Sequence, residues 1–431
     1  MNEKKIIKKI NNKEAKIGII GMGYVGIPLG IEFAQNGFSV VGFDTDNVKI
    51  KDINSGKQIM KHISTKMMNT FVENGGKATS KFTELKSVDC ILVCVPTPLD
   101  IYEQPDMSFV KKAANSISQY IKKGQVVILE STTYPGTTKE IIKPILEKSG
   151  LVAGNDFFLA YSPEREDPGN KDFSVSKIPK VIGGLTPKCL NVANNLYSQI
   201  IEKTVKMSSP EAAEATKLME NIFRAVNIAM VNELKLIFER MDINIWEVIE
   251  AANSKPFGFM PFYPGPGMGG HCIPIDPFYL SWKAKEYNTE AKFIELAGEI
   301  NRKMTENVAH RVGKALNDHS KSIRNSNILV LGLAYKKDID DMRESPALKI
   351  IDLLKFKGAN ISYHDPYIKN ATEMNYVDLN ENSLTKADAV LITTDHSNVD
   401  YEKIGKYAKL VIDTRNVMAN IKNSKAHVLR A

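Results

Sequence analysis

Short apolar runs rich in β-branched residues alternate with helix-like segments at both ends of this chain. Strands that are apolar throughout and separated by helices are typical of parallel sheets that are covered by helices on both faces. The pattern therefore predicts one α/β domain at each end. The runs span residues 16–21, 39–44, 88–95, 125–131 and 157–162 in the first part, and residues 328–335, 359–365, 387–394 and 409–415 in the last part.

The middle of the chain has a helical pattern instead. Ser209-Pro210-Glu211 is a strong helix start, because it supplies a serine cap, a first-turn proline and an acid at the positive end of the helix dipole. Apolar residues then recur at helical spacing until about Asp242, and further helices are expected over residues 245–252 and 291–316. An apolar helix of such length is typical of a link between domains or of a dimer interface.

The expected fold class is therefore α/β, with two Rossmann-like, doubly wound domains joined by a central domain of long helices. We place the first domain at residues 1–205, the central domain at 206–315 and the last domain at 316–431. The central domain is also where we expect the chain to dimerise.

The composition is that of a globular protein. Hydrophobic residues make up 43% and charged residues 25% of the 431 residues, which excludes a disordered or fibrous chain. No apolar stretch is long enough for a signal peptide or for a membrane span of roughly 18 residues. Four cysteines without a C-x-x-C pair favour neither a disulfide framework nor a metal site. We expect a cytoplasmic protein without metal, membrane or nucleic-acid partners, whose net charge of +7 favours anionic small molecules or is simply background.

A glycine-rich turn after the first strand has the pattern of a dinucleotide site. Gly21-Met22-Gly23-Tyr24-Val25-Gly26 opens a helix, and Asp44 ends the second strand 18 residues later. The glycines allow a tight turn, close approach of a pyrophosphate and close helix–strand packing, and the helix N-terminus attracts the pyrophosphate. Asp44 would bind the adenosine ribose and repel a 2′-phosphate, which favours NAD. The alternative is a glycine turn without a ligand. The last domain has only Gly332 at this turn, so it would bind a different nucleotide or none.

The segment Phe262–Leu280 contains the most informative cysteine. Its four glycines between Gly265 and Gly270 leave a backbone that a ligand can approach closely. Cys272 follows, and Asp276 begins another predicted helix. A cysteine just ahead of a helix N-terminus is a better nucleophile because its thiolate is favoured. The alternative is a small buried hydrophobic residue, which is our interpretation of the two cysteines in the strand at 88–95.

Seven motifs, in order, resemble the UDP-glucose/GDP-mannose dehydrogenase family over almost the whole chain. The resemblance is greatest to the bacterial and archaeal branch that acts on UDP-N-acetylhexosamines, especially to its UDP-N-acetylglucosamine 6-dehydrogenases. It implies an NAD-dependent enzyme that oxidises the 6-hydroxymethyl of UDP-N-acetylglucosamine to a carboxylate by two hydride transfers. The motifs are residues 21–26 (GMGYVG), 94–98 (CVPTP), 130–137 (ESTTYPGT), 162–170 (SPEREDPGN), 214–221 (EATKLMEN), 269–276 (GGHCIPID) and 336–345 (KKDIDDMRES).

The second hydride transfer explains why such an enzyme needs a thiol. An aldehyde has no good hydride to give until a nucleophile makes its carbon tetrahedral. The Cys272 thiolate would add to form a thiohemiacetal, loss of hydride would leave a thioester, and water would release the acid. The covalent link would also keep the reactive aldehyde from escaping.

The resemblance also implies roles for residues that would otherwise read as ordinary surface or loop residues. Lys217 and Asn221, one helical turn apart, would hold the oxygen at C6. Asp276 would position or activate water, and it could also be a helix cap. Thr132 and Glu164 would lie near the reacting carbon.

Further matching residues would bind the two nucleotides. Lys336 and Arg415 would contact the UDP-sugar. Arg343 would reach the NAD of the neighbouring subunit, so that a homodimer would be functional as well as structural. Pro96 and Thr97 would close over the cofactor, which Thr132 would also contact. Additional substrate contacts are expected from Glu164, Arg165, Lys217, Asn221, Tyr263, Gly267 and Gly269.

Several alternatives stay open. The sugar could be that of UDP-N-acetylmannosamine, UDP-N-acetylgalactosamine, UDP-glucose or GDP-mannose, although the Asn-Pro-Glu-Phe-Leu pattern of UDP-glucose enzymes is absent. A single-step hydroxyacid dehydrogenase would need neither Cys272 nor a third domain. A non-catalytic nucleotide-sugar binder would not need to retain Lys217 and Asp276. His271 beside the thiol suggests a Cys–His dyad, but neighbours in a loop often point apart.

Overall fold

The computed structural model describes residues 3–60, 63–165 and 175–431, so the end of the 162–170 motif lies outside the described residues. The chain forms two compact units, each described here by itself. The first contains residues 1–220 and 278–289, and the second contains residues 221–277 and 290–431. Helices α8 (Pro210–Arg240) and α10 (Asp276–Lys285) each run from one unit into the other.

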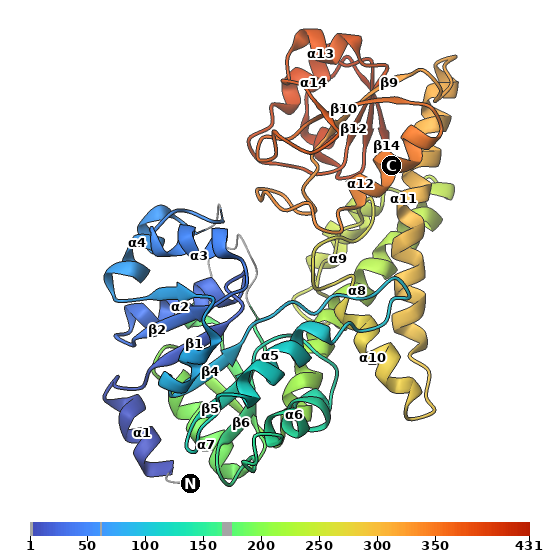
Figure 1. Cartoon of the computed structure of the whole chain (residues 1–431). Helices are drawn as coiled ribbons and strands as arrows, with labels where there is room; N and C mark the ends of the chain where they lie inside the picture. The colour runs from blue at the N-terminus through green and yellow to red at the C-terminus, as the bar shows by residue number, and fades with distance from the viewer. Residues whose placement is uncertain (1–2, 61–62, 166–174) are drawn as a thin grey trace. The chain divides into compact units, whose positions relative to one another are not determined.

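The first unit contains an eight-stranded sheet (Figure 1), of which five strands occupy the predicted runs. These are β1 (Ile17–Ile20), β2 (Val40–Phe43), β4 (Cys90–Val93), β5 (Val126–Leu129) and β6 (Phe158–Tyr161). Three further strands were not expected: β3 (Lys77–Thr79), β7 (Lys180–Gly184) and β8 (Thr204–Met207). The strand order is β3-β2-β1-β4-β5-β6-β7-β8, and only the β6–β7 pair is antiparallel among the described residues. The five predicted strands are buried at every residue, which explains their unbroken apolar sequences.

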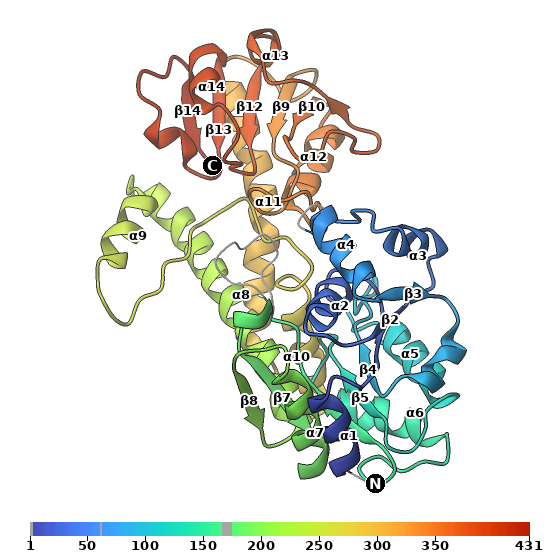
Figure 2. The same cartoon turned by 90° about the vertical axis from the view of Figure 1, so that its left-hand side faces the viewer.

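Helices cover both faces of this sheet, as a doubly wound domain requires. One apolar core joins alternate strand residues to α1 (Glu3–Asn11), α2 (Gly26–Gln35), α4 (Thr65–Glu73) and α7 (Pro187–Tyr197). Figures 1 and 2 show α5 (Ser108–Ser118) and α6 (Lys143–Glu147) on the opposite face. The remaining short elements are α3 (Asn47–Asn54), η1 (Phe82–Ser87), η2 (Thr137–Ile142) and η3 (Val175–Lys177).

The second unit contains the other predicted sheet, with six parallel strands in the order β11-β10-β9-β12-β13-β14. The strands are β9 (Asn327–Leu331), β10 (Asn360–His364), β11 (Asn375–Tyr376), β12 (Ala389–Ile392), β13 (Leu410–Asp413) and β14 (His427–Arg430). One face packs on α11 (Lys292–Asp318) and α12 (Pro346–Phe356). The other face packs on α13 (Glu381–Lys386), α14 (Tyr401–Tyr407) and η4 (Val417–Asn420). The predicted fold class is therefore confirmed.

The predicted long helices are also present. Helix α8 has 31 residues, and the Ser209 hydroxyl accepts a hydrogen bond from Ala212 N at 3.2 Å, as its role as a cap requires. Helix α9 (Ile245–Asn253) and the 27-residue α11 follow where they were expected. No helix in the described part of the chain has the length and apolar character of a membrane span. The domain boundaries at residues 205 and 315 remain a prediction.

A buried ionic cluster joins three elements of the first unit. Glu130 directly follows β5, has no exposed surface and accepts a hydrogen bond from Lys180 Nζ at 2.5 Å. The hydroxyl of Tyr197, from α7, donates a second bond to the same carboxylate. Burial raises the pKa of the Glu130 carboxyl, and the Lys180 ammonium opposes that rise. The charged form of the buried Glu130 carboxylate is therefore stabilised by Lys180 and Tyr197.

We expect Lys180→Met to lower the free energy of unfolding by about 3–5 kcal/mol, because it leaves a buried carboxyl without its counter-ion. Urea unfolding followed by circular dichroism measures the change. Lys188→Met, at an exposed position of α7, is the control and should change stability by less than about 0.5 kcal/mol. Equal losses in the two variants would contradict the role of the buried pair.

Candidate active site

The glycine turn after β1 has the geometry of a dinucleotide site. Gly21 has φ +93°, and a Cβ there would lie 2.5 Å from the carbonyl oxygen of Cys94. A Cβ on Gly26 would lie 2.0 Å from the Gly21 oxygen, so packing within the protein excludes a side chain at both positions. A Cβ on Gly23 would meet nothing within 4 Å. The middle glycine thus faces open space, as a backbone that a pyrophosphate approaches must do.

Asp44 lies beside this turn, at the end of β2. Its carboxylate accepts hydrogen bonds from Met22 N and from Asp46 N, both at 3.0 Å, and pairs with Lys49 Nζ at 3.0 Å. A carboxylate has about four lone-pair sites, so capacity remains for a ribose hydroxyl. Lys49, in the first turn of α3, was not among the predicted residues. Together with the glycine turn, these groups fit the adenosine half of NAD.

Two neighbouring loops carry the other predicted cofactor contacts of the first unit. Pro96 and Thr97 follow β4, and Thr132 follows β5, the next strand of the sheet. The Ser131 hydroxyl donates to Val95 O at 2.7 Å, which ties the two loops together. The hydroxyl of Tyr279, from α10, donates to the carbonyl of Thr97. The fold therefore gathers these residues at the carboxyl edge of the sheet, where doubly wound domains bind ligands.

Glu214 connects the Thr132 loop to the start of α8, one turn before Lys217. Its buried carboxylate accepts bonds from Gly136 N at 2.6 Å and from Thr138 N at 2.9 Å. Burial raises the pKa of Glu214 to about 7, and the bonds from Thr138 limit the rise. These hydrogen bonds of Glu214 were not predicted, although Glu214 lies in one of the seven motifs.

The predicted substrate residue Arg165 is bound to protein groups. Its Nη2 lies 2.5 Å and its Nε 3.2 Å from the two carboxylate oxygens of Glu220 on α8. Its Nη1 donates to Pro179 O at 2.5 Å. Arg165 therefore fastens the loop that carries Glu164 to α8, and the substrate contacts of Arg165 and Glu164 stay predictions.

Cys272 lies in a turn that leads directly into α10. Its carbonyl accepts hydrogen bonds from Ile275 N at 3.1 Å and from Asp276 N at 2.8 Å, and α10 begins at Asp276. Cys272 is partly exposed, whereas the chain's three other cysteines are buried. For Cys90, burial raises the pKa of the thiol, which suppresses its thiolate. By exposure, Cys272 is thus the best placed of the four cysteines to meet a substrate.

Asn221 and Asp276, two of the predicted catalytic residues, are in direct contact. The Asn221 amide donates to Asp276 Oδ2 at 2.5 Å, and Arg224 donates to the amide oxygen of Asn221. Both Asn221 and Asp276 are buried. Arg224, one helical turn after Asn221 on α8, was not predicted and holds the amide in the orientation that faces Asp276.

The glycine-rich loop before Cys272 is held by a pair of buried amides. Asn232 Oδ1, from α8, accepts the Gly265 N–H at 3.0 Å, and Asn232 Nδ2 donates to Asn301 Oδ1 on α11 at 2.9 Å. Further along, a Cβ on Gly269 would lie 2.7 Å from Tyr335 Cβ. We expected these glycines to admit a ligand, but close protein packing already requires the one at 269. Substrate contacts of Tyr263, Gly267 and Gly269 stay predictions.

The loop also contacts the segment with Arg343. Gly270 N donates to Arg343 O at 3.1 Å, and the Arg343 guanidinium pairs with Asp341 at 2.6 Å. Burial lowers the pKa of His271, and the positive charge of Arg343 adds to that shift. Both effects favour the neutral imidazole, and the Cys–His dyad stays an alternative.

Lys336 and Arg415 both lie at the carboxyl edge of the second sheet. Lys336 follows β9, which pairs with β10 and β12 on its two sides and so marks the point where the strand order reverses. Arg415 follows β13, and its Nε donates to Thr393 O at 2.9 Å. Burial lowers the pKa of Arg415, although Asp395 and Asp413 oppose the shift. A cationic switch point of this kind suits a nucleotide diphosphate.

Comparisons with known proteins agree with this geometry. The UDP-glucose/GDP-mannose dehydrogenase family matches in three parts: its NAD binding domain over residues 15–201, its central domain over 211–303 and its UDP binding domain over 329–420. A UDP-N-acetyl-D-mannosamine dehydrogenase of Pyrococcus horikoshii is 36% identical over 94% of this chain and 96% of its own length. A UDP-N-acetyl-D-glucosamine 6-dehydrogenase of Pseudomonas aeruginosa is 36% identical over 92% and 95%. The solved structure of UDP-D-ManNAc dehydrogenase from Pyrococcus horikoshii has a TM-score of 0.88 at 35% identity, covering 96% of this chain and 98% of that one.

We expect Asn232→Ala to lower the free energy of unfolding by about 2–3 kcal/mol, because it leaves the buried Gly265 N–H and the Asn301 amide without their partner. Hydrogen–deuterium exchange should also quicken at Gly265. Asn227→Ala, which removes an exposed amide from the same helix, is the matched control. Unchanged exchange at Gly265 in the Asn232 variant would show that the amide pair does not hold the loop.

Proposed function

Because the chain belongs to the UDP-glucose/GDP-mannose dehydrogenase family, whose members are NAD-dependent nucleotide-sugar dehydrogenases, we propose that it oxidises UDP-N-acetylglucosamine at C6. The product is UDP-N-acetylglucosaminuronic acid, and each sugar reduces two NAD. The observation that carries this proposal is the partly exposed Cys272 at the turn into α10, four residues before Asp276, which accepts a hydrogen bond from Asn221.

Binding of the two nucleotides uses the two sheet edges. The turn at Gly23 and the carboxylate of Asp44 hold the NAD diphosphate and ribose, and Thr97 and Thr132 line the adjoining loops. Lys336 and Arg415 neutralise the diphosphate of the sugar nucleotide. NAD supplies the hydride acceptor for each of the two oxidation steps.

The first oxidation converts the C6 alcohol to an aldehyde. Lys217 and Asn221 stabilise the negative charge that develops on the C6 oxygen as its proton leaves. The amide of Asn221 is oriented by Arg224, so its N–H direction is set before the substrate arrives. Such preorganised donors stabilise charge without reorganising during the reaction.

The second oxidation requires a covalent bond to the protein. The Cys272 thiolate forms a C–S bond to the aldehyde carbon, and the oxygen gains a proton to give a thiohemiacetal. Loss of that proton and of the hydride leaves a thioester. Asp276 accepts a proton from water as the water attacks the thioester. The C–S bond then breaks, and the carboxylate and the free thiol are released.

The choice of N-acetylglucosamine rests on the 162–170 and 262–267 segments, which resemble the enzymes of that specificity. The identity of 36% to the Pseudomonas aeruginosa protein supports it. The equal identity to the Pyrococcus horikoshii protein makes UDP-N-acetylmannosamine the second candidate. The match of residues 329–420 to a UDP binding domain argues against the alternative of a single-step hydroxyacid dehydrogenase, which needs no such domain.

We expect two NADH for every UDP-sugar consumed, measured at the end point with limiting sugar.

Cys272→Ser should reduce NADH formation at least about a hundredfold, because the second step loses its nucleophile. Iodoacetamide should label Cys272 ahead of the three buried cysteines, as mass spectrometry would show, and inactivate the enzyme in parallel. Full four-electron turnover by the serine variant would refute the covalent route.

We expect kcat/KM for UDP-N-acetylglucosamine to exceed that for its rivals by about tenfold or more, since the sugar-facing groups discriminate by hydrogen bonding. NAD reduction is measured in parallel with UDP-N-acetylmannosamine, UDP-N-acetylgalactosamine and UDP-glucose. A higher value for any of these three would reassign the substrate while leaving the family chemistry in place.

A further inference from the structure

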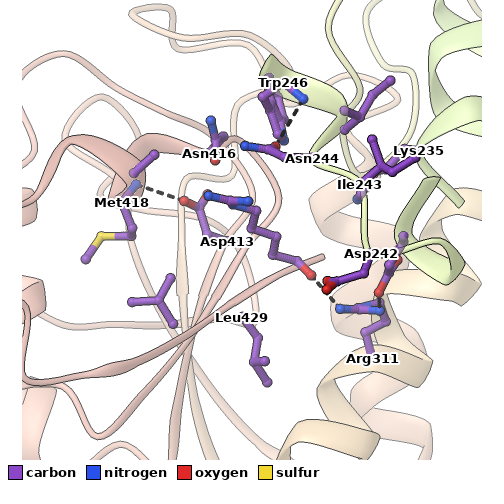
Figure 3. Close-up of a pocket in the computed structure, with 15 residues that line it drawn as sticks. Lys235, Asp242, Ile243, Asn244, Trp246, Arg311, Asp413, Asn416, Met418 and Leu429 are labelled. Atoms are coloured by element: carbon purple, nitrogen blue, oxygen red, sulfur yellow. Dashed lines mark hydrogen bonds and ion pairs between the residues drawn. The ribbon is translucent and has the colours of Figure 1, made fainter. Parts of the chain in front are cut away.

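The second unit contains a cavity that none of the residues assigned above lines. Its volume is about 620 Å³, which is enough for a small-molecule ligand. The end of α8, the start of α9, the middle of α11 and the carboxyl ends of β13 and β14 form its walls (Figure 3). The cavity lies wholly within this unit.

The wall of this cavity contains a buried lysine. Lys235, on α8, is 5% exposed, and its Nζ has no hydrogen-bond partner among the described residues. The side-chain oxygen of Asn416 is buried in the same wall and likewise has no partner in the described part of the chain. A buried ammonium and a buried amide oxygen are costly to leave in this state. Both groups therefore indicate a ligand that supplies an acceptor for one and a donor for the other.

Three other charged groups of this wall, Arg311, Glu239 and Asp413, already have partners. Arg311 pairs with Glu239 and donates to Arg430 O at 2.6 Å. The Asp413 carboxylate accepts backbone N–H bonds from Arg415 at 2.8 Å and from Met418 at 2.9 Å. Lys235 is thus the buried cation of the described wall without a hydrogen-bond partner there, whereas Arg430, which also lines the cavity, is exposed.

The start of α9 adds positive potential to the same cavity. Asn244 caps this nine-residue helix by accepting the Trp246 N–H at 3.2 Å, and both residues line the cavity. Helix N-termini attract anions through their dipole and their free N–H groups. With Lys235, the helix start favours an anion over a cation or a neutral molecule.

We propose that this cavity is a second ligand site, for a small anion that carries hydroxyl groups, such as a sugar carboxylate or a sugar phosphate. Its anionic group pairs with Lys235 and faces the start of α9. A hydroxyl of the ligand donates to Asn416 Oδ1. The partly apolar surfaces of Trp246 and Leu429 pack against the sugar ring. This site goes beyond the oxidation proposed above and uses none of its residues.

Binding of such an anion must also bring a proton to Lys235. Burial lowers the pKa of Lys235 to about 7; Arg311 adds to the shift, Asp413 opposes it and Arg415 adds slightly. Glu239, Asp242 and Arg430 also line this cavity. At pH 8 a group with a pKa of about 7 is roughly nine-tenths neutral. An anion that restores the charge therefore takes up about 0.9 proton per site.

Isothermal titration of the full chain at pH 8, with UDP present at saturation to occupy the nucleotide-sugar site, tests this proposal. The probes are D-glucuronate, which carries a carboxylate, and glucose 1-phosphate, whose second phosphate pKa is near 6. Both probes are therefore ionised at pH 8. The titration is repeated in two buffers of different ionisation enthalpy, and the difference in binding heat gives the number of protons that the protein takes up. We expect at least one probe to bind with an uptake of about 0.9 proton, and the tighter probe identifies the carboxylate or the phosphate source.

Two variants of the cavity and one control locate the binding. Lys235→Met should weaken it at least tenfold and abolish the proton uptake. Asn416→Gly, which keeps the left-handed backbone at φ +59°, should weaken binding but keep the uptake. Lys314→Met removes an exposed charge from α11 and should change neither. Absence of binding by both probes under saturating UDP, or equal binding to the Lys235 variant, would overturn the proposal.

A cooperative thermal unfolding transition would show that the lysine variant folds. Unfolded lysine keeps its proton up to about pH 10.4, whereas folded Lys235 loses it above about pH 7. The penalty of the buried ammonium is therefore complete below pH 7 and fades between pH 7 and pH 10. We expect Lys235→Met to melt above the parent protein at pH 6.5, by a margin that shrinks toward pH 10. A margin that does not change with pH would mean that Lys235 is not held as a destabilised cation.

Discussion

Two turns of the chain pass so close to a neighbouring strand that no side chain fits there, and both sheet edges depend on them. A Cβ on Gly21 would lie 2.5 Å from the Cys94 oxygen, and one on Gly332 would lie 2.4 Å from Thr394 Cβ. Both glycines have a positive φ, of +93° and +89°. Each turn also directs the next amide toward a carboxylate at the end of the adjacent strand, at 3.0 Å for Met22 with Asp44 and 2.7 Å for Leu333 with Asp365.

The two edges differ in what surrounds that carboxylate. Asp44 retains some exposure and pairs with Lys49, beside a turn whose middle glycine faces open space. Asp365 is fully buried, and His396 Nε2 lies 3.1 Å from its Oδ2. The Asp365 carboxylate therefore holds the loop that leads from β9 to Lys336. This explains why one sheet has the features of a dinucleotide site and the other those of a different nucleotide site.

The glycines of the loop before Cys272 have a packing role that we did not predict. We expected its glycines because a ligand must approach the backbone, and the structure shows that Tyr335 already approaches Gly269. The amide pair of Asn232 and Asn301 then holds the start of the loop. The thiol lies on a segment that the protein itself positions tightly, which is what precise covalent catalysis needs.

The sequence by itself determined the features whose cause lies within a few neighbouring residues. The buried central strands, the Ser209 cap of α8, the glycine turn at Gly21 and the turn from Cys272 into α10 all follow from local periodicity, capping or backbone freedom. The edge strands β3 and β8 escaped prediction because they are short and partly exposed, and so lack an apolar run. Only the tertiary structure decided the pairing of Asn232 with a residue 69 positions away, the Arg165–Glu220 pair and the burial of Lys235 where no described residue bonds its Nζ. Such contacts depend on which segments the fold brings together, and no local pattern records that.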